Sequence, residues 1–539
     1  MKKEIRYLLA AVLVCFVLSG CAKKQNTDQS NSDELNGDML IEASIGDASN
    51  LNPLLATDSS SSDINGLIFN GLVKYDKDLK LTGDLASSWE ILDNGLVIVF
   101  HLRKGVKWHD GKEFTSQDVK FTYEKLIDPK VKTAFSSDFE KVKEIEIPDT
   151  WTVKVFYKEI FAPALASWGM SIIPKHLLEK GDFNKNVFNA HPIGTGPYVF
   201  EEWVQMEKIV LRANPDYFEG KPRIARYVYR IIPDLGVQFS ELEKGTVDFM
   251  GLSVEQYKKD KNVLASKYKI NVYRYPAINS YTYLGYNLLS PFFKDKRVRK
   301  AIAFAINKKE IVDAVLQGFG SPVTGPYPPT FWAYNKGVED YNFDINKAKR
   351  LLAEAGWRDS DSDGIIDKNG VPFRFTVITN QGNKEREMCA TIIQDKLSKI
   401  GIKADIRILE WSTFLHQYVD KKKFDAVLLG WSVTLDPDQY SIWHSSQIER
   451  GYNFISYKND EVDKLLDEGR KTFDQDARKK IYNRFHKIIA DDQPYCFLYV
   501  RDSLPAINSR FKGIQVAPIG ISYNFIKWYV PRNERKYLQ

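Results

Sequence analysis

Residues 88–119, SWEILDNGLVIVFHLRKGVKWHDGKEFTSQDV, contain the two patterns that decide the fold. Residues 95–102 are rich in β-branched and aromatic side chains, which is typical of a strand. Thr115 and Ser116 are favoured helix N-caps, and apolar residues follow them at helical spacing as far as Leu126. A strand followed by a helix that covers it predicts a mixed α/β fold.

Strand-like and helix-like segments keep alternating after this stretch. Strand-like runs lie at residues 153–157, 208–211, 227–232 and 270–275, and a long helical pattern starts near Lys296. A chain of 539 residues is too long for one compact domain, so two or three lobes are expected.

Residues 345–429 predict a second lobe. The helix-like segment 386–400 lies between strand-like runs at 374–379 and 403–409, which favours a βαβ unit with a partly parallel sheet. The aromatic stretch 521–529 predicts strands that return the chain to the lobe in which it began.

The N-terminus predicts export. Lys2, Lys3 and Arg6 precede an apolar run at residues 8–18, which is shorter than the roughly 20 residues that a spanning helix needs. Residues 1–20 are therefore expected to be a signal peptide.

The string LSGC, which ends at Cys21, resembles the bacterial lipobox. This implies that Cys21 takes a diacylglycerol and becomes the first residue of the mature chain. Residues 21–38 are otherwise polar and lack aromatics, so the lipidated cysteine is expected to begin a flexible tether. The folded body would then lie outside the cytoplasm, anchored to the outer face of the bacterial cytoplasmic membrane.

Charge and cysteine content narrow the possible classes. The net charge is +6 with both signs interspersed, which gives no argument for a nucleic-acid partner. Cys15 falls in the predicted signal and Cys21 in the lipobox, so only Cys389 and Cys496 reach the folded body. They are far apart and lack CxxC spacing, which favours two buried thiols over a disulfide.

Catalytic motifs are missing from the sequence. None of the seven histidines lies in H-E-x-x-H, and no G-x-S-x-G occurs. Asp436 and Asp438 offer paired carboxylates, but the proline between them predicts a turn. We therefore expect a binding protein without a cofactor and not an enzyme.

One acidic loop matches part of a calcium site. Asp359, Asp361, Asp363 and Asp367 occupy loop positions 1, 3, 5 and 9, but position 12 is Gly370 instead of the bidentate glutamate of an EF-hand. An Asp/Gly-rich hairpin loop is favoured, calcium remains a structural alternative, and no metal is expected at the functional site.

Five blocks of sequence, in order, resemble the peptide/nickel/opine class of bacterial extracellular solute-binding proteins. They are residues 88–119, PIGTGPY from Pro192, ANPDYFEGKP from Ala213, FKDKRVRKAIAFAINKKEI from Phe293, and KAKRLLAEAGW ending at Trp357. The likeness continues in order over nearly the whole mature chain. DQYSIWHSSQ after Pro437 is most similar to the oligopeptide-binding branch of Gram-positive bacteria.

The resemblance implies a two-lobed clamp of the periplasmic-binding-protein type II, in its three-domain peptide-binding variant, with mixed sheets and an interlobe cleft. The implied division is lobe I at 39–70, 188–275 and 505–539, inserted domain II at 71–187, and lobe III at 276–504. Such proteins bind peptide backbone as an added strand, close around it, and deliver it to the permease of an ATP-binding-cassette importer. A monomer is expected.

The resemblance also implies ligand-binding residues. Gly430, Trp431 and Ser432 match the lobe III strand that pairs with peptide, Trp411 and Tyr499 match pocket aromatics, and Thr57, Asp58, Ser59, Ser60 and Ser61 match the facing lobe I segment. Tyr440, an aromatic in a polar loop, is a further candidate for an apolar pocket.

One position departs from the pattern. Many relatives read W-x-x-D, with an aspartate that pairs with the peptide amino terminus, whereas this chain has Thr434 there. Either Asp436 or Asp438 replaces the anchor, or the terminus stays nearer water and the ligands are longer. Leu428 stands in place of the relatives' arginine, which argues against dipeptide selectivity.

Other ligands and roles remain open on the sequence alone. Nickel, haem or oligosaccharide would suit the same fold, with His416 and His444 as the suggestive nickel ligands. A peptide-sensing lipoprotein and a secreted hydrolase that uses Asp436 and Asp438 are remote alternatives.

Overall fold

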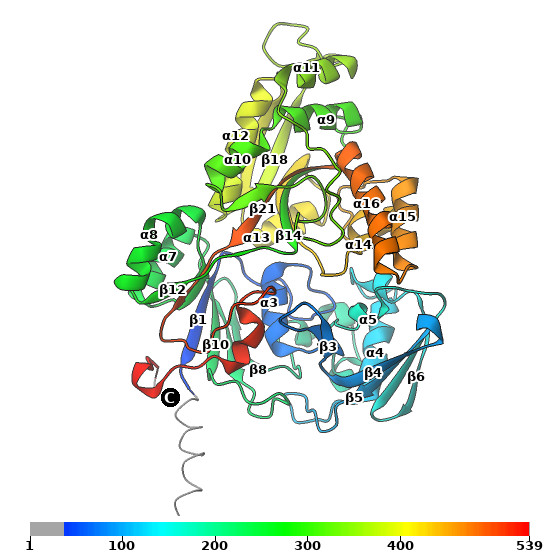
Figure 1. Cartoon of the computed structure of the whole chain (residues 1–539), viewed down its shortest axis with the longest axis vertical. Helices are drawn as coiled ribbons and strands as arrows, with labels where there is room; N and C mark the ends of the chain where they lie inside the picture. Colours follow the sequence, from blue (N-terminus) through cyan, green and yellow to red (C-terminus); the bar gives the residue numbers. More distant parts are fainter. Residues whose placement is uncertain (1–36, 538–539) are drawn as a thin grey trace, which may run out of the picture.

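The computed structural model describes residues 37–537 and contains three principal sheets (Figure 1). A seven-stranded sheet in the lower part of Figure 1 is the first sheet, and a four-stranded sheet beside it is the small sheet. Another seven-stranded sheet, the second sheet, forms the centre of the upper part. The elements around the first and small sheets are called the lower body here, and those around the second sheet the upper body.

The first sheet is mixed, with strand order β12-β22-β11-β1-β10-β9-β8. Its strands are β1 (Met39–Ser44), β8 (Tyr198–Val204), β9 (Lys208–Ala213), β10 (Arg226–Ile231), β11 (Phe249–Gly251), β12 (Ile270–Val272) and β22 (Pro505–Asn508). β1 runs parallel to β10 and β11, and the remaining pairs are antiparallel.

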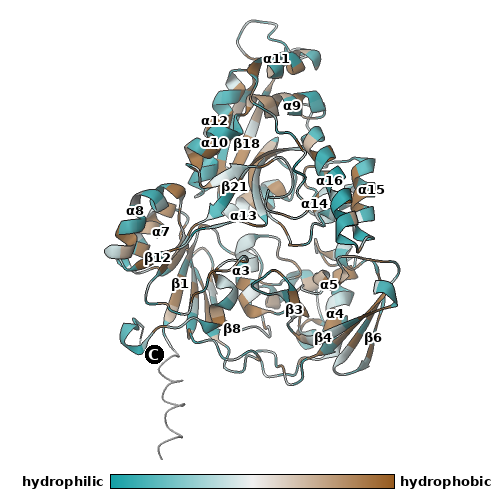
Figure 2. Cartoon of the chain, in the orientation of Figure 1, coloured by the Kyte–Doolittle hydropathy of each residue, from teal (hydrophilic) through white to brown (hydrophobic). Residues whose placement is uncertain are grey.

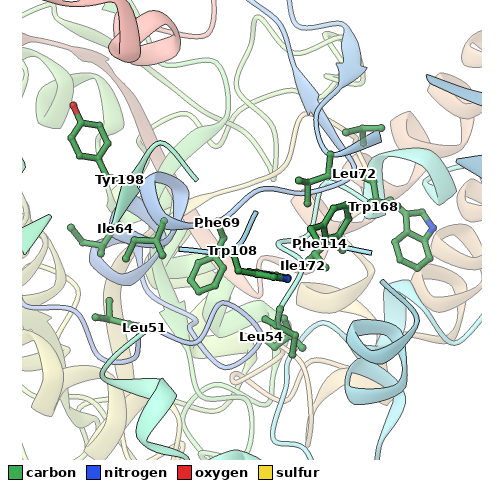
Figure 3. Close-up of a cluster of buried hydrophobic side chains, with 14 of the residues drawn as sticks. Leu51, Leu54, Ile64, Phe69, Leu72, Trp108, Phe114, Trp168, Ile172 and Tyr198 are labelled. Atoms are coloured by element: carbon green, nitrogen blue, oxygen red, sulfur yellow. The ribbon is translucent and has the colours of Figure 1, made fainter. Parts of the chain in front are cut away.

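The small sheet contains the strand predicted at residues 95–102, and the predicted helix follows it in the chain. Its strands are β4 (Ala86–Leu92), β5 (Val97–Leu102), β6 (Val142–Asp149) and β7 (Thr152–Tyr157). The helix α4 (Ser116–Ile127) begins after Thr115, which forms a capping box with Asp118, so the predicted strand and helix are confirmed. Figure 3 shows Trp108, Phe114 and Trp168 in the buried cluster that joins this sheet to the first.

The second sheet holds the predicted βαβ unit. Its strands are β13 (Tyr275–Pro276), β14 (Ser280–Tyr286), β15 (Gly320–Pro322), β18 (Arg374–Asn380), β19 (Lys403–Leu409), β20 (Ala426–Ser432) and β21 (Tyr495–Ser503). β18 and β19 are parallel, with α12 (Lys384–Ser398) between them in the chain. Two further hairpins pair β2 (Val73–Tyr75) with β3 (Leu81–Gly83), and β16 (Asp367–Lys368) with β17 (Val371–Pro372).

Helices cover the sheets and place their apolar faces inward, as Figure 2 shows for α15 and α16. The other α-helices are α3 (Ser59–Ile68), α5 (Ala164–Ser167), α6 (Lys175–Leu178), α7 (Leu235–Lys244), α8 (Val254–Ser266), α9 (Lys296–Ala305), α10 (Lys308–Val315), α11 (Ile345–Glu354), α13 (Trp411–Thr413), α14 (Tyr440–Trp443), α15 (Asp460–Arg470) and α16 (Gln475–Asp492). Within residues 37–537 no helix has the length and apolarity needed to cross a membrane.

Two adjacent strand junctions connect the bodies. β12 of the first sheet leads into β13 of the second, and β21 of the second leads into β22 of the first. β13 pairs with β21 and β12 pairs with β22, so the two junctions lie side by side. Paired crossings of this kind form a hinge about which two bodies can open and close.

Three details bear on the sequence predictions. The expected strands at 521–529 are wrong, because Ser522–Lys527 forms 3-10 turns whose aromatic side chains pack on the first sheet. The long helix near Lys296 is two helices, because Asn307 caps the start of α10. Cys389 and Cys496 are free and buried, which confirms the expected thiols.

Candidate functional site

A cavity of about 340 Å³ lies between the lower and upper bodies, next to the strand junctions. The lower wall comes from β1, the start of α3 and the residues around β11, and the upper wall from the ends of β18, β19 and β21. Its polar and aromatic lining residues are Glu42, Ser44, Ser59, Ser60, Asp63, Tyr229, Gln238, Ser253, Asn380, Asn383, Glu385, Arg386, Trp411 and Arg501. The cavity therefore has the character of a ligand site with many polar groups.

Chain geometry explains how the upper wall is built. Asn380 ends β18 and Trp411 follows β19, and these two parallel strands finish at the same edge of the second sheet. Asn383 caps α12 by accepting a hydrogen bond from the backbone N–H of Arg386, which fixes the first turn of that helix at the cavity. Ligand sites commonly lie at the carboxyl ends of parallel strands.

Arginines dominate the charge of the upper wall. Arg501 pairs with Glu385 at 2.8 Å. Arg386 donates to the side-chain oxygen of Asn380 at 2.7 Å, and no carboxylate within residues 37–537 forms an ion pair with it. Burial lowers the pKa of Arg386, because desolvation disfavours its charged form.

Carboxyl groups dominate the lower wall. Glu42 accepts a hydrogen bond from Tyr227. Glu42 is half-buried and Asp63 is exposed within the cavity. Partial desolvation and the neighbouring charge of Asp63 raise the pKa of Glu42 to about 8, and partial desolvation with the charge of Asp58 raises the pKa of Asp63 to about 7. The cavity therefore has an acidic lower wall and a basic upper wall.

Two polar atoms on the upper wall have no hydrogen-bond partner among the described residues. They are the Nε1 of Trp411, a donor, and the Oε1 of Glu385, an acceptor. Leaving such groups unsatisfied in a buried place costs about 1–3 kcal/mol each. A ligand or water in the cavity would satisfy them.

Three of the predicted ligand residues line this cavity: Ser59, Ser60 and Trp411. Asp58 instead caps α3, where it accepts from the backbone N–H of Ser61 at 2.9 Å, and it is buried together with Ser61. Thr57, beside them, is exposed outside the lining.

The predicted peptide-pairing strand has one open edge. Along β20, Gly430, Trp431 and Ser432 pair with β14 on one side. On the other side, the pairing with β18 ends at Val427, so the described structure gives these three residues no strand partner there. Trp431 also packs among upper-body aromatics and donates to the hydroxyl of Tyr495 at 3.3 Å.

Tyr499 does not line the cavity. It is 1% exposed and lies in β21 within the core of the upper body, so the prediction of a pocket aromatic is wrong at this position. β21 is a central strand covered on both faces, and an alternating pattern alone does not distinguish a core aromatic from a lining one.

Asp436 and Asp438 already have cationic partners. Both oxygens of Asp436 accept from Arg478, at 2.8 and 2.9 Å, and Asp438 accepts from the Nε of Arg470 at 2.8 Å. The expectation that one of these carboxylates replaces the missing amino-terminal anchor is corrected accordingly. Thr434 is exposed, and its hydroxyl donates to the backbone oxygen of Asp436.

Tyr440 lies outside the cavity as well. Its ring stacks on His444 and lies under the guanidinium of Arg470, 3.8 Å from the ring centroid. The other suggestive histidine, His416, pairs with Asp420. The residues that line the cavity thus include neither histidine.

The acidic loop brings together three of its four candidate ligands. Carboxylate oxygens of Asp359, Asp361 and Asp363 lie within 4.8 Å of one another and are exposed. Asp367 instead accepts hydrogen bonds from the backbone and hydroxyl of Ser360 and begins the hairpin β16–β17.

All five charged lining residues of the described structure were absent from the predicted set: Glu42, Asp63, Glu385, Arg386 and Arg501. A usable signal existed for Glu385 and Arg386, because both lie in the first turn of a helix that follows a predicted parallel strand. Glu42 lies on β1 and Asp63 on α3. Only the tertiary fold decides which side of that strand and of that helix faces the cavity, so the sequence offers no signal for these two acids.

These features define a clamp of two bodies that meet at paired strand junctions, with a polar cavity between them. Residues 80–452 match the family described as "Bacterial extracellular solute-binding proteins, family 5 Middle". The chain belongs to this family, and the predicted fold class, a two-lobed α/β clamp with mixed sheets, is confirmed.

Known relatives are similar over nearly their whole length. The chain is 37% identical to the oligopeptide-binding protein AppA of Bacillus subtilis, over 98% of this chain and 99% of that one. The structure of AppA in complex with a nonapeptide superposes with a TM-score of 0.88 and covers 92% of this chain and 99% of that one. NikZ from Campylobacter jejuni in complex with Ni(L-His) is 30% identical, with a TM-score of 0.83 over 91% of this chain and 99% of that one.

Proposed function

We propose that this chain is the substrate-binding lipoprotein of an ATP-binding-cassette importer and captures oligopeptides between its two bodies. The observation that carries the proposal is the open backbone edge of Gly430–Ser432 beside a polar cavity. A peptide that adds as a strand gains main-chain hydrogen bonds whatever its sequence, which suits nutrient uptake. The relative solved with a nonapeptide supports a ligand of this kind.

Peptide is a better candidate than nickel on the geometry. No histidine lines the cavity in the described part of the chain, whereas imidazole is a preferred nickel ligand. The lining instead offers amides, carboxylates and guanidinium groups, which match peptide amides and charged termini. The chain acts in this proposal by binding and release, without catalysis.

The proposal includes a division into domains. Lobe I takes residues 39–70, 188–275 and 505–539, domain II takes 71–187, and lobe III takes 276–504. The membership of the strands in the first, small and second sheets supports this division. Closure about the strand junctions would signal to the permease that the ligand is present.

The proposal also places the protein on the outer face of the bacterial cytoplasmic membrane, as a monomer held by a lipid on Cys21. Cys21 and most of the tether lie outside the described residues. Growth of cells with palmitate analogues, followed by mass spectrometry of wild type and Cys21→Ser, tests the anchor. Loss of lipid from the variant alone is the expected result, and a variant that still carries lipid would contradict it.

Gly430→Ala is expected to weaken oligopeptide binding about tenfold. A β-carbon at Gly430 would lie 2.8 Å from the Nη2 of Arg386 and 3.0 Å from the backbone oxygen of Tyr281. The arginine would have to shift beside the strand on which the peptide is proposed to pair. Isothermal titration calorimetry with a nonapeptide measures the change.

Gly251→Ala is the matched control for this substitution. Gly251 lines the cavity, and a β-carbon there meets no atom within 4 Å. Its affinity should stay within about twofold of wild type. Equal affinities in wild type and Gly430→Ala would argue against strand addition at β20.

A further inference from the structure

Two carboxyl groups of the lower body face the cavity without a cation to balance them. Glu42 on β1 and Asp63 on α3 line the cavity, and neither forms an ion pair with a lysine, arginine or histidine in residues 37–537. Glu42 has the hydroxyl of Tyr227 as a partner, whereas Asp63 accepts no hydrogen bond from the described residues. The groups around them include Tyr229, Ser44 and Ser60, which carry no charge at neutral pH.

The surroundings penalise ionisation of these two acids. Glu42 is half-buried and Asp63 is exposed to solvent in the cavity. Desolvation by the cavity walls raises the pKa of Glu42 to about 8 and that of Asp63 to about 7, and the mutual repulsion of the carboxylates adds to the effect on Glu42. A cation brought between them would favour the ionised forms and relieve that repulsion. The arginines of the opposite wall are directed elsewhere, since Arg501 pairs with Glu385 and Arg386 bonds to Asn380.

The opposite wall gives an independent indication that a ligand belongs in this cavity. Glu385 is 6% exposed and lines the cavity, yet its Oε1 has no hydrogen-bond partner in the described structure. The Nε1 of Trp411 is likewise buried without an acceptor. Buried polar atoms are nearly always satisfied, so these two atoms need partners in the cavity, which a polar ligand group can supply.

We propose that Glu42 and Asp63 bind a positively charged nitrogen of the peptide. This inference rests on the proposed function and narrows its substrates to peptides that present an ammonium or guanidinium group at the hinge side of the cleft. It also names a carboxylate partner for the peptide amino terminus, which Thr434 in place of the relatives' aspartate leaves without one. The cationic anchor lies on the lower body, because the upper-body carboxylates Asp436 and Asp438 are already paired with arginines.

The amino terminus and a basic side chain are the two sources of such a nitrogen, and a set of Ala/Ser nonapeptides separates them. One peptide has a free amino terminus and no basic residue, and one is N-acetylated and neutral. The others are N-acetylated with a single lysine at each position in turn. Calorimetry of the wild type should show at least one charged peptide that binds about tenfold more tightly than the neutral one.

The double variant Glu42→Gln/Asp63→Asn is expected to lose this preference. Its affinity for the neutral peptide should remain within about twofold of wild type, because the amides are isosteric with the protonated acids. Glu207→Gln, an exposed lower-body carboxyl outside the cavity, is the matched control and should keep the full preference. If the double variant fails to fold, the two single variants are compared, and each should lose part of the preference.

The outcomes separate this inference from the proposed function. A wild type that binds neutral and charged peptides equally, or a preference that survives in the double variant, would overturn the inference and leave peptide binding intact. A wild type that binds none of the nonapeptides would overturn the proposed function itself.

Discussion

An Arg510→Met variant is expected to lose about 3–5 kcal/mol of its free energy of unfolding. Arg510 is 7% exposed, and its guanidinium pairs with Asp38 and, at 2.8 Å, with Asp248. Both carboxylates are buried, and they belong to the segments that precede β1 and β11. Methionine keeps much of the side-chain volume but leaves two buried charges without a partner.

Urea denaturation followed by tryptophan fluorescence measures this loss. Arg374→Met is the matched control, because Arg374 pairs with Asp405 on the surface and both side chains are about half exposed. Exposed pairs of this kind contribute about 0–1 kcal/mol. A loss of less than 1 kcal/mol in Arg510→Met would mean that the Asp38–Arg510–Asp248 cluster does not hold the first sheet to the chain that follows β22.

Arg470→Met is expected to weaken oligopeptide binding about 100-fold, which corresponds to about 3 kcal/mol. Arg470 ends α15 of the upper body, where it pairs with Asp438, and it also reaches the lower body. There it donates to the backbone oxygen of Ser137 at 2.9 Å and to Asp138 at 2.7 Å. Without the guanidinium, closing the bodies would bring the carboxylates of Asp138 and Asp438 together with no cation between them.

Two further variants test whether the effect of Arg470→Met comes from its contacts with the lower body. Arg484→Met on the neighbouring helix α16 removes an exposed pair with Glu461 and should leave affinity unchanged. Adding Asp138→Asn to Arg470→Met should recover part of the affinity, because one of the two facing charges is removed. Calorimetry gives the dissociation constants, and small-angle scattering with and without peptide reports closure. Unchanged affinity and closure in Arg470→Met would mean that the contacts of Arg470 with Ser137 and Asp138 do not stabilise the closed, peptide-bound form.

The architecture was predictable wherever local pattern and resemblance agreed. The strand and helix within 88–119 and the βαβ unit at 374–409 follow from period and capping, which depend on neighbours in sequence. The prediction of strands at 521–529 was wrong, because aromatic residues are enriched both in strands and in irregular segments that pack on a sheet.

The site was predictable only in part. Ser59, Ser60 and Trp411 were found because resemblance carried them to the cleft. Tyr499 was misplaced, because the sequence does not say which face of a central strand meets a cavity. The partners of Asp436 and Asp438 lie more than 30 residues away on α15 and at the start of α16, so their neutralisation is a property of tertiary structure alone.

The cleft between the two bodies is proposed to capture oligopeptides by backbone pairing. Protein expressed without residues 1–21 would be incubated with a peptide library of mixed sequence and lengths, separated from free peptide, and denatured so that retained ligands can be identified by mass spectrometry. Retained peptides of narrow length and mixed sequence are the predicted result. A folded protein that retains no peptide, or that releases a sugar or a metal complex carried from the cell, would contradict the claim.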